Sequence, residues 1–193
     1  MTDSHHQDEW RESLEGAKDI IIDSLAETMD LYGVTRSVGT LYGTMYVEGD
    51  MTLDEMREKL GMSKPSMSTG VRKLQEFNVV KKTHRRGKRK QTYVAEKDFF
   101  RFFTNFFTQQ WEREVRTNLS AIESARKQLD MLIQSEEAEE SIKEEAREIQ
   151  RILSQSIKYY KWLSRLVESM ETGELFKYIP IEEDIEEDDE KER

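Results

Sequence analysis

Cysteine is absent from this 193-residue chain, and the sequence holds only three histidines and two prolines. Disulfides, thiolate catalysis and cysteine-based zinc sites are therefore excluded. We also find no phosphate-cradling glycine loop and no nucleophile-elbow pattern. These absences predict that the protein is not an enzyme and uses neither a metal ion nor another cofactor.

Long hydrophobic runs are absent too. No apolar stretch approaches the roughly 20 residues that span a bilayer, and residues 1–6 lack the basic-then-apolar pattern of a signal peptide. We expect a cytoplasmic protein without a membrane partner. Apolar and charged residues each make up 36% of the chain, a balance typical of helix-rich proteins with much exposed surface.

Acidic residues outnumber basic ones, giving a net charge of −10, but the two signs are unevenly distributed. Residues 64–90 contain ten Lys and Arg against one acid, Glu76, and carry +9, so the remainder carries −19. A concentrated basic segment on an acidic body is typical of a protein that binds a polyanion, because phosphate responds to the local field. A solvated face is the alternative interpretation of such a run.

Helical periodicity begins near the N-terminus. Residues 7–32 carry apolar side chains at three- and four-residue steps, Gly33 is a natural stop, and a second helix is expected over residues 36–47. Gly39 and Gly43 lie one turn apart in that second helix. Their spacing predicts that another helix approaches it closely.

The C-terminal half is predicted to form long helices with a break at residues 136–140. From Ile142 to Met170, apolar residues recur in eight steps over 28 residues, which is the period of a coiled coil. Such a helix needs a partner helix, and a domain of this size offers few internal ones. Residues 181–193 contain nine acids and two basic residues, a composition that predicts disorder.

The middle segment has the signals of two short helices joined by a tight turn. Thr52 to Glu55 have the form of a capping box at the start of the first helix, which ends at Gly61. Ser63 caps the second helix and Pro65 lies in its first turn, where a missing N–H is tolerated. Asn78 can take the left-handed conformation that ends a helix.

Two short strands, residues 79–83 and 91–95, follow and flank a basic turn at Gly87. Helix, turn, helix and basic hairpin is the order of a winged helix-turn-helix, whose second helix enters the DNA major groove. The predicted fold is thus mainly α, with a winged helix-turn-helix domain, a small β-hairpin wing and long N- and C-terminal dimerisation helices. A small helical domain with a cationic face is the alternative.

Hydroxyl and basic side chains of the second helix and the wing are the predicted DNA contacts. Short hydroxyls near a helix N-terminus approach phosphates or base edges closely, and Arg72 and Lys73 reach further, to guanine or phosphate. Arg86 and Arg89 fit a narrow minor groove, and we interpret His84 as a wing contact because no second histidine is near. The candidate contacts are Ser63, Lys64, Ser66, Met67, Ser68, Thr69, Arg72, Lys73, Arg85, Arg86, Lys88, Arg89 and Lys90.

Three stretches carry a resemblance to a known family: Gly33 to Gly43, Thr52 to Glu55 and Met62 to Leu74. Over about residues 10–115 the chain resembles the GbsR branch of the MarR regulators in specific motifs, and beyond that in general layout. The resemblance implies a homodimer built on terminal helices that binds operators near genes for choline and glycine betaine uptake or synthesis. Some members of this family sense choline through an aromatic cage.

Aromatic residues are numerous enough to form such a cage. A quaternary ammonium has no hydrogen to donate, so proteins hold it on ring faces, each contributing about 0.5–2 kcal/mol. The candidate cage residues are Tyr42, Phe103, Trp111, Tyr159 and Tyr160. A place in the hydrophobic core is the alternative, and the more frequent one, for aromatic residues at helical spacing.

These observations predict four segments: an N-terminal dimerisation helix (1–32), a winged helix-turn-helix (33–96), C-terminal helices for dimerisation and a ligand pocket (97–178), and an acidic disordered tail (179–193). The predicted function is a homodimeric, sequence-specific repressor of osmoprotectant genes that binds double-stranded DNA and is relieved by choline. Two alternatives remain open: a family member without a choline response, and an architectural DNA-binding protein without a ligand.

Overall fold

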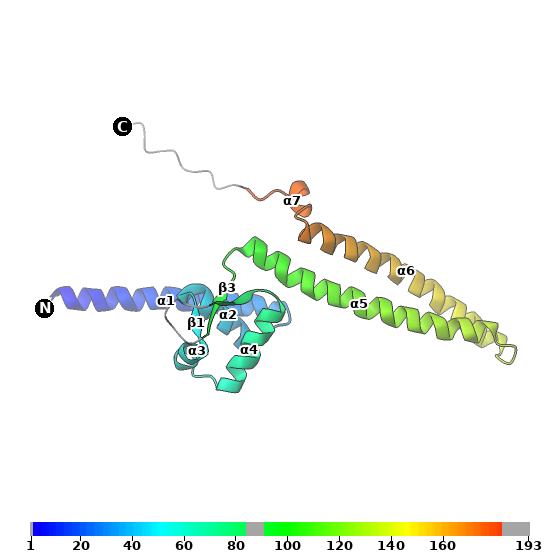
Figure 1. Ribbon diagram of the computed structural model, residues 1–193, viewed down its shortest axis with the longest axis horizontal. Helices are drawn as coiled ribbons and strands as arrows, with labels where there is room; N and C mark the ends of the chain where they lie inside the picture. The colour runs from blue at the N-terminus through cyan, green and yellow to red at the C-terminus, as the bar shows by residue number, and fades with distance from the viewer. Residues whose placement is uncertain (1, 84–90, 183–193) are drawn as a thin grey trace, which may run out of the picture. The chain divides into compact units, whose positions relative to one another are not determined.

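The computed structural model describes residues 2–83 and 91–182, with side chains from His6 onward. Its elements are α1 (Thr2–Leu31), α2 (Arg36–Glu48), β1 (Met51–Thr52), α3 (Leu53–Leu60), α4 (Lys64–Glu76), β2 (Val80–Thr83), β3 (Thr92–Ala95), α5 (Phe99–Gln134), α6 (Glu140–Glu171) and α7 (Leu175–Tyr178). The chain divides into two units, residues 1–109 and 110–193, and α5 runs from the first into the second (Figure 1).

The close packing predicted for the second helix is confirmed, and its partner is α1. Ile22, Ala26 and Met29 of α1 are buried where that helix packs on α2. A Cβ atom added at Gly39 would lie 2.8 Å from the Ala26 Cα atom, and one at Gly43 would lie 3.1 Å from that of Ile22. Both glycines therefore permit a backbone separation that a larger side chain would prevent.

The apolar stripe of α1 is buried only toward its C-terminal end. Trp10 and Leu14 are exposed by 69% and 57%, although they continue the periodic stripe. The 13 residues of α2 span only about 20 Å at 1.5 Å per residue, so α2 covers less than half of a 30-residue helix. The first turns of α1 consequently present an apolar face to solvent.

The first unit also contains a three-stranded antiparallel sheet of order β1-β3-β2. The β2–β3 hairpin matches the predicted wing strands, with Val80 opposite Ala95 and Thr83 opposite Thr92. Strand β1 was not predicted, because its two residues are too few to show an alternating pattern. It pairs with the other edge of β3 through Met51 and Thr52, which attaches the start of α3 to the wing.

One hydrophobic core lies within the first unit. It includes buried side chains of α2, α3, α4, the sheet and the first two turns of α5: Leu41, Tyr42, Met45, Met56, Met67, Val71, Leu74, Val80, Tyr93, Phe102 and Phe106. The N-terminal part of α5 thus belongs to the core that orients the helix-turn-helix.

The second unit is a helical hairpin of α5 and α6. Val115 and Ile122 of α5 are buried, as are Leu163 and Val167 of α6, and α5 ends at Gln134, so the predicted break is confirmed. The single turn α7 was not predicted. No helix in the described part of the chain is long and apolar enough to cross a membrane.

Candidate nucleic-acid interface and aromatic cavity

Helix α3 starts with the predicted capping box. The Glu55 backbone N–H donates to the Thr52 hydroxyl oxygen at 3.2 Å, and the Thr52 backbone N–H donates to the Glu55 carboxylate at 2.7 Å. Gly61 ends the helix with a φ of 63°, a conformation that glycine adopts without steric penalty. The first helix of the motif is thus fixed at both ends by local sequence.

Helix α4 begins at Lys64, three residues after Gly61, also as predicted. The Ser66 backbone N–H donates to the hydroxyl oxygen of the Ser63 cap at 3.3 Å, and Pro65 lies in the first turn. The helix is followed by Asn78 at a φ of 56°. In Figure 1, α3 and α4 meet at the turn that connects them, and α4 runs from there back toward α2.

Most of the predicted contacts on α4 are exposed. Met67 is the exception: its side chain is fully buried in the core, so its expected exposure is wrong. Met67, Val71 and Leu74 share one face of the helix, at steps of four and three, and this face packs inward. Met67 lies between Ser66 and Ser68 in the sequence, so its place on the buried face was not evident from its neighbours. The exposed members are Ser63, Lys64, Ser66, Ser68, Thr69 and Arg72.

The two basic residues near the end of α4 differ in their surroundings. The Lys73 ammonium lies 3.6 Å from the Glu76 carboxylate and 4.7 Å from the centre of the Phe77 ring. Arg72 is exposed and makes no ion pair with another described residue. Arg72 is therefore the better placed of the two to meet a nucleic acid without first breaking an ion pair.

The basic turn of the wing lies outside the described residues. Its predicted contacts, Arg85, Arg86, Lys88, Arg89 and Lys90, stay predictions, as does the role given to His84. The structure does describe the strands that lead to this turn, where Lys81 and Lys82 of β2 are exposed.

An aromatic cavity of about 190 Å³ lies within the first unit, between α1, α2 and the start of α5. The Tyr32 and Phe107 ring centres are 5.0 Å apart, and those of Tyr42 and Phe102 are 5.1 Å apart. The lining residues are Leu25, Thr28, Met29, Tyr32, Tyr42, Phe99, Phe102, Phe103 and Phe107. The cavity thus has ring faces and aliphatic groups but no charged side chain in its wall.

Tyr42 is anchored beside this cavity. Its hydroxyl donates to the Glu96 carbonyl oxygen at 2.7 Å, which ties α2 to the chain segment between β3 and α5. Burial raises the pKa of the Tyr42 phenol above its ordinary value, with smaller contributions from Tyr46 and Glu96. The phenol therefore stays neutral. Its ring forms part of the cavity wall while its hydroxyl is hydrogen-bonded to Glu96.

The structure brings together only part of the predicted cage. Tyr42 and Phe103 line the cavity of the first unit, whereas Trp111, Tyr159 and Tyr160 belong to the second unit, where the Tyr159 and Tyr160 rings lie 5.1 Å apart. The predicted cage did not include Tyr32, Phe99, Phe102 and Phe107, which also line this cavity. The dense run of Phe residues was the available signal, but the sequence alone could not distinguish core rings from cavity rings.

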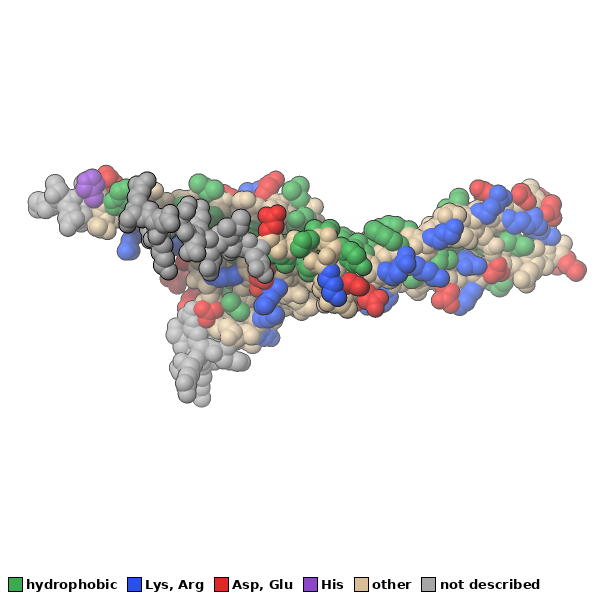
Figure 2. Space-filling view, turned by 90° about the horizontal axis from the view of Figure 1, so that it is seen from above, with side chains coloured by type: hydrophobic (Ala, Val, Ile, Leu, Met, Phe, Trp, Pro, Cys, Tyr) green, Lys and Arg blue, Asp and Glu red, His purple; other side chains and the backbone are tan. Residues whose placement is uncertain are grey.

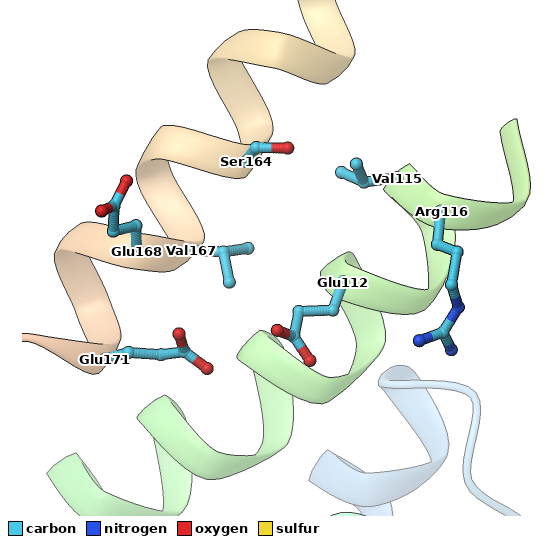
Figure 3. Close-up of a pocket in the computed structure, with 7 residues that line it drawn as sticks. All are labelled: Glu112, Val115, Arg116, Ser164, Val167, Glu168 and Glu171. Carbon is cyan, nitrogen blue, oxygen red and sulfur yellow. The ribbon is translucent and has the colours of Figure 1, made fainter. Parts of the chain in front are cut away.

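A groove of about 340 Å³ lies between α5 and α6 in the second unit. Figure 3 shows Val115 and Val167 between the two helices, with Glu112, Glu168 and Glu171 around them. Its rim is charged and its wall holds no ring, so it does not suit a quaternary ammonium in the way that the aromatic cavity does. In the described part of the chain, no cluster of acidic or histidine side chains could hold a metal ion.

Comparison with known proteins shows the family of the chain. It is 62% identical over 170 residues to the HTH-type transcriptional repressor GbsR of Bacillus subtilis (strain 168), a match that covers 88% of this chain and 94% of the relative. The model of the GbsR family transcriptional regulator C-terminal helical hairpin matches residues 99–177. The chain belongs to the GbsR family of transcriptional regulators.

Two further members of the family are related more distantly. The putative HTH-type transcriptional regulator YvaV and the HTH-type transcriptional repressor OpcR, both of Bacillus subtilis (strain 168), are 35% and 33% identical to the chain. Each match covers 86% of this chain, with 94% and 91% of the relative. A crystal structure of a transcriptional regulator covers 79% of this chain and 99% of its own at a TM-score of 0.49 and 17% identity.

The family assignment confirms three expectations. The chain is a DNA-binding transcriptional regulator of the helix-turn-helix type, it is not an enzyme, and its resemblance to the GbsR branch extends along nearly the whole sequence. The matched C-terminal hairpin contains α5 and α6, which the sequence analysis related to the family only in general layout.

Proposed function

We propose that this GbsR-family protein is a sequence-specific repressor that inserts α4 into the major groove of an operator. The exposed hydroxyl and basic side chains along one face of α4, opposite the buried face of Met67, Val71 and Leu74, carry this proposal. The name of the 62% identical relative, a transcriptional repressor, supports repression over activation. Because that relative is bacterial, we infer a cytoplasmic site of action.

The protein acts as a homodimer in this proposal. Trp10 of α1 and Ile152 and Trp162 of α6 are exposed by 69%, 57% and 50%, and large exposed apolar side chains that gather on one helix face mark surfaces that a partner covers. Figure 2 shows hydrophobic side chains at the surface among charged ones. A dimer would offer two α4 helices to an operator whose half-sites are about one helical turn apart.

Choline or a related quaternary ammonium is the proposed inducer, held in the aromatic cavity. Tyr and Phe faces attract a cation by about 0.5–2 kcal/mol each, and the cavity has six rings in its wall. No hydrogen-bond donor is needed for a trimethylammonium group, so an apolar wall suits it. A bound ligand would favour a dimer geometry whose half-site spacing no longer matches the operator.

Selection of bound sequences from a random DNA pool, with and without choline, tests this function. We expect one enriched palindromic sequence whose recovery falls when choline is present. If the protein is architectural, it will bind selected and random DNA within a few-fold of each other, with a similar salt dependence. If the enriched sequence is recovered equally in both pools, the repressor has no choline response.

Calorimetry with choline tests the cavity directly. Replacing Phe103, which lines it, with Ala should weaken choline binding by about tenfold, because one ring face is lost. Phe100→Ala is the matched control, since Phe100 lies on the same helix, is 48% exposed and does not line the cavity. If the two substitutions weaken choline binding equally, choline does not bind in this cavity. If the parent protein does not bind choline at millimolar concentration, choline is not the inducer.

A further inference from the structure

The corner between α4 and β2 is attached to α5 by two neighbouring residues. Asn78, which forms the corner, has a φ of 56° although it is not glycine. The Asn105 side-chain amide donates to its carbonyl oxygen at 3.1 Å. One residue along α5, the Phe106 ring centre lies 4.5 Å from that of Phe77, and both rings are buried.

The same turn of α5 adjoins the aromatic cavity. Phe106 does not line that cavity, but its ring centre lies 5.6 Å from those of Phe102 and Tyr32 and 5.3 Å from that of Phe107. All three of these neighbours line the cavity. A single layer of packed rings therefore separates the cavity from the end of the DNA-contacting helix.

We propose that Asn105 and Phe106 are positioning residues that set the direction of α4 and transmit occupancy of the cavity to it. Packed rings move together because interiors have few voids, so a ligand that displaces Phe102 or Phe107 also displaces Phe106 and the Phe77–Asn78 corner. The Asn105 amide holds a left-handed conformation that few side chains adopt. The part of this proposal that concerns the ligand rests on the choline site proposed above.

A purely structural hydrogen bond would have a different signature from a positioning one. A structural bond changes the melting temperature and leaves the affinity of the folded protein for DNA intact. A positioning bond changes that affinity at temperatures where the protein remains folded. It also changes the factor by which choline weakens the binding of operator DNA. This factor is the measure of coupling between the two sites.

Asn105→Leu removes the amide donor and keeps the approximate size of the side chain. Asn118→Leu is the matched control, because the Asn118 amide donates to the Glu114 carbonyl of its own helix at 2.9 Å. Well below the melting temperature, we expect Asn105→Leu to weaken binding of the selected operator by about threefold or more, and Asn118→Leu to stay within twofold. Equal operator affinities of Asn105→Leu and the parent would overturn the positioning role.

Choline is the probe for the second half of the proposal. In Asn105→Leu, calorimetry should give a choline affinity within about twofold of the parent, while the factor by which choline weakens operator binding falls toward one. An unchanged factor would overturn the part given to Asn105 in the transmission. If the parent protein binds no choline, the ligand and the transmission both fail, and the operator affinities of the two variants still decide the positioning role.

Discussion

Gly39 shows how one residue fixes the distance between two helices. A methyl carbon added at this position would lie 2.8 Å from the Ala26 Cα atom and 2.9 Å from the Ala26 carbonyl oxygen. Because both atoms are backbone, neither can move aside as a flexible side chain would. Gly39→Ala must therefore separate α1 from α2.

We expect Gly39→Ala to lower the free energy of unfolding by about 1–3 kcal/mol, the usual effect of overpacking. Gly16→Ala is the control, since Gly16 lies in α1 and has no atom within 4 Å of the added carbon; it should raise stability by about 0.5–1 kcal/mol through helix propensity. Urea denaturation measures both. Equal, stabilising effects would contradict the close packing assigned to Gly39.

Tyr42 gives a prediction about pH. Burial raises the pKa of its phenol in the folded protein, while the unfolded chain has the ordinary value of about 10. The stability that the neutral, hydrogen-bonded phenol contributes is therefore complete below about pH 10 and is lost as the pH rises above that value. Tyr42→Phe has no phenol to ionise, and it loses the hydrogen bond to Glu96.

At neutral pH, Tyr42→Phe should be less stable than the parent by about 1 kcal/mol, the usual net value of such a bond. Above about pH 10 the difference between the two proteins should narrow, because only the parent carries the ionisation penalty at this position. Denaturation of both proteins across this pH range provides the measurement. A difference that stays constant with pH would show that Tyr42 is not the group responsible.

At the scale of an element, α4 combines two faces with different tasks. Its inward face holds the fold together, and its outward face is available to DNA. The separation is seen in Val71, which is buried, and Arg72, its exposed neighbour. A substitution on the outward face should therefore alter DNA binding and leave stability nearly unchanged.

Arg72→Ala should weaken operator binding by about 1–3 kcal/mol and relax sequence preference at one position, if the guanidinium contacts a base edge. Arg101→Ala removes the same charge from α5, where Arg101 pairs with Asp98 at 3.4 Å, and serves as the control for net charge. Titration of both variants with selected and mismatched operators at fixed salt measures the affinity and the sequence preference of each. Loss of affinity that is equal on every sequence would assign Arg72 to phosphate instead.

At the scale of the whole molecule, the exposed apolar residues of α1 and α6 bear on assembly. Trp162 is 50% exposed on a helix whose other face packs on α5. A charge placed there would disfavour burial against a second copy, because an unpaired charge is costly to remove from water. The measured mass of the protein in solution should respond to that change.

Trp162→Glu should shift the proposed dimer toward monomer at micromolar concentration in sedimentation experiments, and it should weaken operator binding because one half-site is lost. Ser154→Glu introduces the same charge at another exposed position of α6 that is not in the stripe shared by Ile152 and Trp162, and it should leave the proposed dimer intact. A dimer that persists in Trp162→Glu would place the interface on other faces of the molecule.

Local signals in the sequence determined most of the secondary structure. The Thr52–Glu55 capping box, the Ser63 cap and the left-handed Asn78 act within a few residues of themselves, so their effects can be derived without knowledge of distant contacts. The same holds for the basic segment at residues 64–90, whose charge depends on composition alone. These features were sufficient to predict a helix-turn-helix with a strand hairpin after it.

Tertiary structure alone decided which apolar residues are covered. The burial of Met67, the exposure of Trp10 and the meeting of Tyr32 with Phe107 depend on where other helices pass, and periodicity does not encode the length or position of a partner. For the same reason the predicted cage combined rings from two units, whereas the aromatic cavity in the structure is lined by residues of α1, α2 and the start of α5.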